Sequence, residues 1–321
     1  LFKGSNYLEA LSQAKYFVFD KTGTLTKGVF RVQPVHPHGM TPVELLKYAA
    51  YAEFYSTHPI SASLKHGFGQ EIDPKKIENV EEIAGHGVLA VVEGHKVFAG
   101  NDKLMRMKEI EYNEPDNLPG TVVHVALDGK YAGYILIADE IKGDAPKAIK
   151  ELKANGLLST VMLTGDVQVV ADKVAAETGI ARVYAGLLPG DKVDILEGLM
   201  KERQAGGKLV FVGDGINDAP VLARADIGVA MGGVGSDAAI EAADMVIMTD
   251  EPSKLATGIK ISRKTINIAR QNTTLAISIK LLVLALSAVG MASMWAAVFS
   301  DIGVTVIAVL NAMRALQVKE L

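Results

Sequence analysis

The stretch DKTGTLT, residues 20–26, constrains the fold of this chain more than any other feature. The four residues before it, 16–19, form an unbroken apolar run typical of a buried parallel strand, and Gly23 permits a turn directly afterwards. Asp20 is therefore expected at the carboxyl end of a strand, where open parallel sheets bind ligands. An aspartate placed there can attack phosphorus and form an aspartyl phosphate. An isolated Asp-Lys-Thr would instead indicate only an acidic turn.

Two later apolar runs end in the same way. Residues 160–163 lead into Thr164-Gly165-Asp166, and residues 209–212 lead into GDGINDAP, residues 213–220. Together with the runs at 135–138, 227–230 and 245–248, they predict an α/β fold with a doubly wound parallel sheet. Because the carboxyl ends of parallel strands meet at one edge of a sheet, the three polar groups are expected to lie together.

A phosphoryl-transfer site needs a nucleophile, magnesium held by carboxylates, and donors for the phosphoryl oxygens. Asp20 is the predicted nucleophile, and Asp20, Asp214 and the backbone carbonyl of Thr22 are the predicted magnesium ligands. Lys192, close to the start of an expected helix, provides a fixed cation. Together with Lys192, the residues Thr164, Gly165 and Asn217 are expected to bind phosphoryl oxygens. Asp218 is expected to support the shell of ligands around the magnesium ion. Lys21 and Asp166 complete the predicted catalytic set.

In this order, DKTGT, TGD, a Pro-x-Asp-Lys motif and GDGxNDAP resemble the signature of P-type ATPases, the ion pumps whose catalytic core is haloacid-dehalogenase-like. The chain departs from that pattern once, because Gly190 stands where the family usually has glutamate between the proline and the aspartate. Lys192 is retained, so we expect little effect on the chemistry.

The parallel-sheet pattern is interrupted after residue 30. We expect a phosphorylation domain in two pieces, residues 1–30 and 134–265, with an α+β nucleotide-binding domain inserted at residues 31–133. The insert contains a helical pattern at 41–55, a second short helix around 62–64, and alternating segments at 88–92, 96–99 and 121–127 that predict antiparallel hairpins.

The GxGxxA pattern at residues 85–90 leads into a strand rather than a helix, which argues against a dinucleotide fold, and the chain has no GxxxxGK[ST] phosphate loop. From the residues alone, the histidines and glycines of the insert indicate only turns. In the heavy-metal branch of the pumps, matching residues line the adenine pocket. The resemblance therefore implies an ATP pocket lined by Glu53, His58, Gly85, Gly87, Gly100 and Asn101.

Residues 266–321 are expected to form two transmembrane helices, at about 273–295 and 296–313. Each is close to the roughly 20 residues that a bilayer requires, and basic residues flank only their outer ends. By the positive-inside rule both ends are cytoplasmic. A pair of buried core helices is the alternative.

The two apolar segments contain two charged residues, Lys280 and Asp301. Charges in hydrocarbon are costly unless they are paired or functional, so this pair indicates either an ion path or a structural salt bridge. Asn272, Lys280 and Asp301-Ile302-Gly303 resemble the last membrane helices of zinc, cadmium and lead pumps. That resemblance implies that Asp301 binds the transported ion and that Lys280 is its built-in counter-ion. Carboxylate suits a divalent ion better than Cu(I).

The chain is thus expected to be the carboxy-terminal half of an ATP-driven exporter of Zn²⁺, Cd²⁺ or Pb²⁺, integral to a plasma or inner membrane, with its catalytic domains cytoplasmic. It begins at Leu1 rather than methionine, and the resemblance implies an upstream actuator domain and further membrane helices. A net charge of −4 without a basic block argues against nucleic acid, and the absence of cysteine excludes disulfides and a thiol nucleophile.

Three alternatives remain at this point. A copper-exporting relative shares the phosphorylation chemistry. A soluble haloacid-dehalogenase-like phosphatase usually carries a second aspartate two residues after the nucleophile, where this chain has Thr22. A nucleotide-sensing membrane anchor without turnover is the non-enzymatic possibility.

Overall fold

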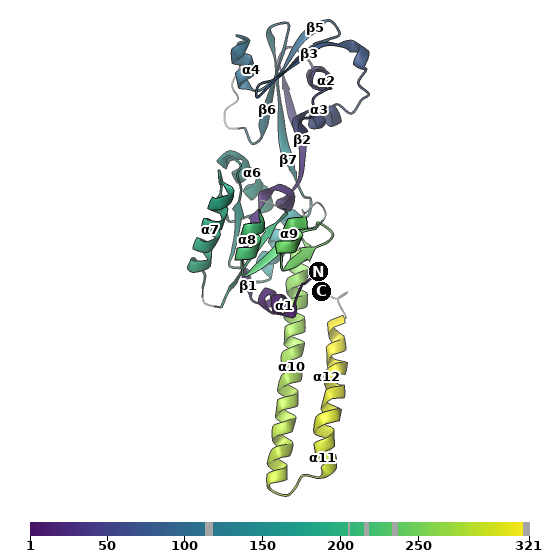
Figure 1. The fold of residues 1–321 in the computed structure, drawn as a ribbon, viewed down its shortest axis with the longest axis vertical. Helices are drawn as coiled ribbons and strands as arrows, with labels where there is room; N and C mark the ends of the chain where they lie inside the picture. Colours follow the sequence, from purple (N-terminus) through teal and green to yellow (C-terminus); the bar gives the residue numbers. More distant parts are fainter. Residues whose placement is uncertain (113–117, 205, 215–217, 233–236, 317–321) are drawn as a thin grey trace.

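The computed structural model describes residues 1–112, 118–204, 206–214, 218–232 and 237–316. The molecule is elongated: an antiparallel-sheet unit lies at one end, a parallel-sheet unit lies in the middle, and two long helices extend from the other end (Figure 1). The amino terminus lies near the junction of the parallel-sheet unit and the long helices (Figure 1).

The parallel sheet has the strand order β12-β11-β10-β1-β8-β9. From β1 the chain reaches β8 and β9 on one side and then crosses to β10, β11 and β12 on the other, so the sheet is doubly wound around β1. Its strands are β1 (Ala14–Asp20), β8 (Ser159–Leu163), β9 (Arg182–Tyr184), β10 (Lys208–Gly213), β11 (Ile227–Met231) and β12 (Met245–Ile247). All registered pairs are parallel.

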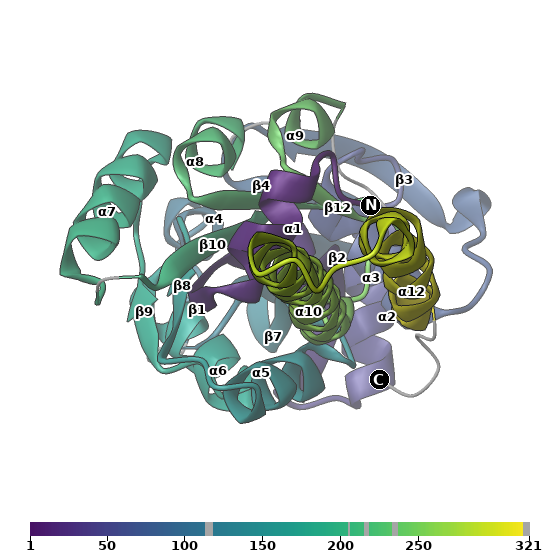
Figure 2. The same cartoon turned by 90° about the horizontal axis from the view of Figure 1, so that it is seen from below.

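Helices cover both faces of this sheet, as Figure 2 shows. One face packs against α1 (Ser5–Ser12), α5 (Ala145–Ala154), α6 (Gln168–Thr178) and the start of α10 (Lys254–Ala288). The other packs against α7 (Pro189–Glu202), α8 (Ala219–Arg224) and α9 (Asp237–Ala242). The apolar strands are buried on both sides, which explains their unbroken hydrophobic runs.

The inserted unit is built on an antiparallel sheet of order β2-β7-β6-β5-β4-β3. The strands are β2 (Thr26–Pro37), β3 (Ile77–Ile83), β4 (Gly87–Val92), β5 (His95–Gly100), β6 (Thr121–Leu127) and β7 (Lys130–Ile141), with a short 3₁₀ turn, η2 (Pro74–Lys76), before β3. Its helices are α2 (Pro42–Ala52), which Thr41 and Glu44 start with a capping box, α3 (Pro59–Phe68) and α4 (Asp102–Met107). The predicted hairpins and helices of the insert are present.

Residues 135–138 were predicted to be a strand of the parallel sheet, and this prediction was wrong. They belong to β7, which pairs antiparallel with β2 and β6. The reason is the two-residue turn Asp128-Gly129, whose φ angles are both positive, because so short a turn joins only antiparallel strands. The sixth parallel strand is instead β9, which is too short for its pattern to indicate a strand.

The strand β2 begins at Thr26 and β7 ends at Ile141, so the sheet of the inserted unit extends beyond the expected bounds of 31–133. These two long strands form the connection between the two units (Figure 1). The strands are hydrogen-bonded from Thr26–Ile141 to Pro37–Gly133.

The helical hairpin consists of α10, which is 35 residues long, and a second segment made of α11 (Met294–Val298), the π-helical turn η4 (Phe299–Gly303), α12 (Val304–Ala312) and η5 (Met313–Leu316). By length and composition, each is able to cross a membrane. The turn lies at residues 289–293, earlier than the expected boundary at 295/296. Gly290 takes a left-handed φ of 72° there, and Ser293 caps the next helix through the Ala296 amide.

Candidate functional site

Asp20 ends the central strand β1 and is only 6% exposed. The ammonium group of Lys192, in the first turns of α7, donates to Asp20 Oδ1 at 2.5 Å and to Asp218 Oδ1 at 2.9 Å. The structure thus places Lys192 beside the carboxyl end of β1. A buried carboxylate with one cation beside it is oriented, and its charge is partly balanced.

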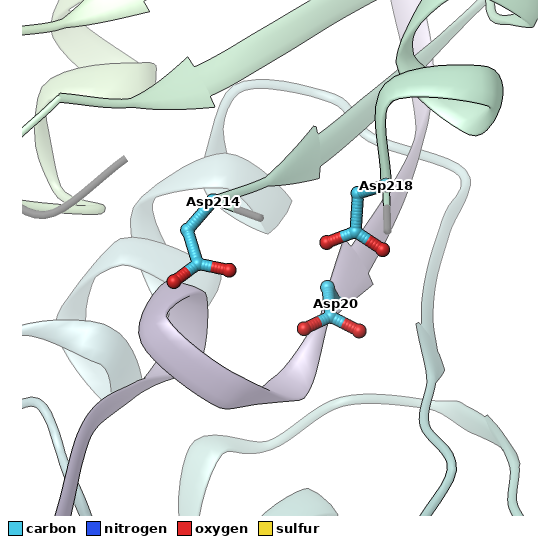
Figure 3. A group of neighbouring side chains, drawn as sticks. All are labelled: Asp20, Asp214 and Asp218. Carbon is cyan, nitrogen blue, oxygen red and sulfur yellow. The ribbon is translucent and has the colours of Figure 1, made fainter. Parts of the chain in front are cut away.

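Three carboxylates converge at this edge, as Figure 3 shows. Asp20 comes from β1, Asp214 follows β10, and Asp218 precedes α8; one oxygen from each lies within 4.8 Å of the others. Burial and the charge of Asp218 raise the pKa of Asp20 to about 7, although Lys192 opposes the shift. Burial and Asp218 raise the pKa of Asp214 to about 6. Three carboxylates held this close together repel one another. A bound Mg²⁺, which prefers oxygen ligands, would offset that repulsion.

Gly23 is required by the position of Asp214. A Cβ atom at Gly23 would lie 1.5 Å from Asp214 Oδ2, and φ at Gly23 is +71°. The carboxylate of Asp214 therefore lies directly over the turn that follows the nucleophile, and Thr22 occupies the same turn. Only glycine combines that left-handed conformation with so close an approach.

The other predicted site residues lie around this centre. Thr164 is buried just after β8, and its hydroxyl accepts a hydrogen bond from the amide of Asp166 at 3.1 Å. Gly165 lies between them. Lys21 is buried, and its Nζ lies 2.6 Å from Asp166 Oδ2. Asn217 lies outside the described residues.

Two polar residues next to the site were missed by the sequence analysis. Asp139, on β7, lies 3.5 Å from Lys21 Nζ and accepts a hydrogen bond from Thr26. Lys142, just after β7, donates to the Gly23 carbonyl at 2.7 Å. Both follow the strand segment that was assigned to the wrong sheet, so no pattern placed them near Asp20.

A pocket of about 260 Å³ lies in the inserted unit. It is lined by all six residues predicted for the nucleotide, Glu53, His58, Gly85, Gly87, Gly100 and Asn101. Glu53 is buried, which raises its pKa, and accepts from Ser61 Oγ at 2.5 Å. Asn101 Nδ2 donates to the Gly85 carbonyl at 2.9 Å.

The glycines bring the strands of this pocket into close contact. A Cβ at Gly87 would lie 2.2 Å from the Ala99 carbonyl, and one at Gly100 would lie 2.2 Å from the His86 carbonyl. His58 caps α3, because its Nδ1 accepts from the Ile60 amide at 3.3 Å. The pocket is thus a concave site with a buried acid and polar edges, which suits a purine.

In the helical hairpin, Lys280 Nζ lies 2.9 Å from Asp301 Oδ1. They face a groove of about 600 Å³ between α10 and the second segment. Asn272, about halfway along α10, and Asn311, near the end of the second segment, connect the two, with Asn311 Nδ2 donating to Asn272 Oδ1 at 2.8 Å. The side chains of Lys280 and Asp301 are 60% and 71% exposed within this chain.

Comparison with known proteins gives a consistent picture. The haloacid dehalogenase-like hydrolase family matches residues 14–226. The chain is 55% identical over 320 residues to the cadmium, zinc and cobalt-transporting ATPase of Bacillus subtilis, covering 99% of this chain and 45% of that protein. It is 54% identical over 315 residues to the zinc-transporting ATPase of Synechocystis, covering 98% of this chain and 43% of that protein.

Among solved structures, the chain resembles a zinc-transporting PIB-type ATPase in the E2.Pi state, with a TM-score of 0.88 and 36% identity, covering 99% of this chain and 52% of the other. It also resembles the catalytic domain of the CPx-ATPase CopB-B, with a TM-score of 0.62 and 29% identity, over 81% of this chain and 95% of the other. The chain spans about half the length of the curated relatives that it matches.

Proposed function

We propose that this chain, which belongs to the haloacid dehalogenase-like hydrolase family, is the catalytic half of a P-type ATPase that exports divalent heavy-metal ions, as its similarity to metal-transporting ATPases suggests. The resemblance inferred from the motifs and the predicted fold class are both confirmed by the relatives. Zn²⁺, Cd²⁺ and Pb²⁺ are the proposed cargo, and the proposed location is a plasma or inner membrane with the catalytic units in the cytoplasm.

The proposed reaction is transfer of the γ-phosphoryl group of ATP to Asp20. A carboxylate oxygen of Asp20 forms a bond to phosphorus, the bond to the β,γ-bridging oxygen breaks, and ADP leaves. Lys192 balances the charge of the acceptor and of the incoming phosphoryl group, and Asp218 holds Lys192 in place. Magnesium, when held by Asp20, Asp214 and the Thr22 carbonyl, would neutralise the phosphoryl oxygens.

In this proposal ATP binds with its purine in the pocket of Glu53 and His58, and its phosphates reach the Asp20 edge when the two units approach across β2 and β7. Thr164, Gly165 and Asn217 are proposed to bind phosphoryl oxygens, and Lys21 with Asp166 to fix the turn beside the nucleophile. Hydrolysis of the aspartyl phosphate is assigned to an actuator domain elsewhere in the parent protein.

One observation favours a divalent cargo over copper. Asp301 and Lys280 form an ion pair that lines the groove of the helical hairpin. A carboxylate is a hard oxygen ligand, whereas Cu(I) prefers thiolate and thioether.

The test is ATP hydrolysis by the complete parent protein in lipid, titrated separately with Zn²⁺, Cd²⁺, Pb²⁺ and Cu(I). We expect the divalent ions to stimulate hydrolysis. Stimulation by Cu(I) alone would overturn the cargo assignment while leaving the phosphorylation chemistry intact.

The nucleotide pocket gives a prediction that is independent of the membrane. His58→Ala should weaken ATP binding by about 10-fold, or about 1.4 kcal/mol, because it removes one polar wall of the purine pocket. Calorimetric titration of the full chain in detergent measures the change. His95→Ala is the control, because His95 is an exposed histidine of the same unit that pairs with Asp128. Equal affinities for the His58 variant and the unaltered chain would reject the pocket.

The raised pKa values of Asp20 and Asp214 predict a pH-dependent magnesium affinity. Both carboxyls gain protons as the pH falls through about 7 and about 6, and each must lose its proton before it binds the ion. The apparent Mg²⁺ affinity should therefore fall by at least about 10-fold between pH 7.5 and 5.5. Calorimetry in two buffers of different ionisation enthalpy would report the released protons. A constant affinity across this range would contradict the assignment.

A further inference from the structure

Lys142 is a buried cation that contacts the turn after the nucleophile. It is 6% exposed and lies between β7 and α5. Its backbone amide donates to the Leu25 carbonyl at 2.9 Å, and its Nζ donates to the Gly23 carbonyl at 2.7 Å. Since the Asp214 carboxylate also packs against Gly23, Lys142 and this site carboxylate contact the same residue.

The same ammonium group also reaches the origin of the long membrane helix. Lys142 Nζ lies 2.9 Å from Asp250 Oδ1, in the short connection between β12 and α10. Asp250 has a positive φ of 58°, a conformation that costs energy for a residue other than glycine unless its surroundings hold it. A second contact joins the same two segments: the amide of Ser253, the residue before α10, donates to Asp144 Oδ2 at 2.9 Å.

From this junction α10 continues without interruption past Lys280, which lies about 39 Å from Lys254 at 1.5 Å per residue. Figure 1 shows α10 running from the parallel-sheet unit to the far end of the hairpin. A displacement at the start of a continuous helix is carried along its length, so the position of Asp250 bears on the position of Lys280.

We propose that Lys142 is a positioning residue that couples the phosphorylation turn to α10, through an ammonium group shared between the Gly23 carbonyl and Asp250. This inference rests on the proposed function. Magnesium and a phosphoryl group at the Asp20 edge change the charge and position of the 21–25 turn, and the bond from Lys142 to Gly23 conveys that change to Asp250. In the opposite direction, an ion in the hairpin biases the same turn toward phosphorylation, as reciprocal coupling requires.

The test compares metal dependence with phosphorylation itself. In the complete parent protein, acid-stable label from ATP is measured with and without Zn²⁺ for the unaltered protein and for Asp250→Asn. In the presence of Zn²⁺, we expect the variant to be labelled as strongly as the unaltered protein. The ratio of labelling with Zn²⁺ to labelling without Zn²⁺ should fall by about 5-fold or more. Asp250→Glu, which retains the carboxylate, should restore the ratio.

Glu251→Gln is the matched control, because Glu251 is the neighbouring exposed acid and pairs only with Lys254, 3.1 Å away within the same turn, in the described contacts. Lys142→Met combined with Asp250→Asn should change the ratio no further than Lys142→Met alone, since the loss of Lys142 already removes its contact with Asp250. An Asp250→Asn ratio equal to that of the unaltered protein would overturn the inference. Absence of label in the unaltered protein would instead overturn the proposed function.

Discussion

Asp20→Asn is expected to abolish the acid-stable, hydroxylamine-sensitive phosphoprotein formed from ATP. The amide oxygen is a far weaker nucleophile than the carboxylate and cannot give an acyl phosphate, so labelling should fall by at least about 100-fold. The variant should still fold, because an amide of the same size keeps an acceptor for Lys192 and removes a charge that burial destabilises.

Gel autoradiography after an acid quench measures this effect. Asp172→Asn, an exposed aspartate on α6, is the matched control and should label like the unaltered chain. ATP affinity should be retained in both variants, because the pocket of Glu53 and His58 is in the other unit. Undiminished labelling of Asp20→Asn would refute the assignment of the nucleophile.

Asp301→Ala should remove the stimulation of ATP hydrolysis by divalent metal ions in the complete protein. The substitution deletes the proposed oxygen ligand and leaves Lys280 without the partner that it has 2.9 Å away. An unpaired cation facing the groove would also repel the incoming ion, so we expect the stimulation to fall by at least about 10-fold.

Zn²⁺-stimulated release of inorganic phosphate in lipid vesicles is the readout. Asp301→Glu retains the carboxylate and should recover part of the stimulation, whereas Thr305→Val, in the same groove, should change it little. Phosphorylation from inorganic phosphate in the Asp301→Ala variant would show that the catalytic unit is still folded. Divalent stimulation that is indifferent to Asp301 would exclude it from the ion path.

The central part of the site could be predicted from the sequence because its residues follow buried apolar strands. Asp20 and Thr164 come directly after such a run, Asp214 follows one after a single glycine, and the geometry of a parallel sheet then places them at one edge. The helix that carries Lys192 was recognisable from Pro189 in its first turn. These signals are local, so a single sequence contains them.

The contacts around that centre could not be predicted, because they depend on pairings between distant segments. Lys142 and Asp250 are 108 residues apart, and nothing near either residue indicates the other. Asp139 was missed because residues 135–138 are as apolar as a parallel strand, and only the Asp128-Gly129 turn reveals their antiparallel partner. The ends of the membrane helices shifted for a similar reason, since Gly290 and Ser293 decide the turn within a uniformly apolar segment.

The most direct test of the central claim is chemical mapping of the phosphorylated residue. The chain is incubated with magnesium and ATP, quenched in acid and reduced with borohydride, which converts an aspartyl phosphate to homoserine, and its peptides are then sequenced by mass spectrometry. The account predicts homoserine at position 20. Homoserine at another aspartate, or label that survives hydroxylamine, would contradict it.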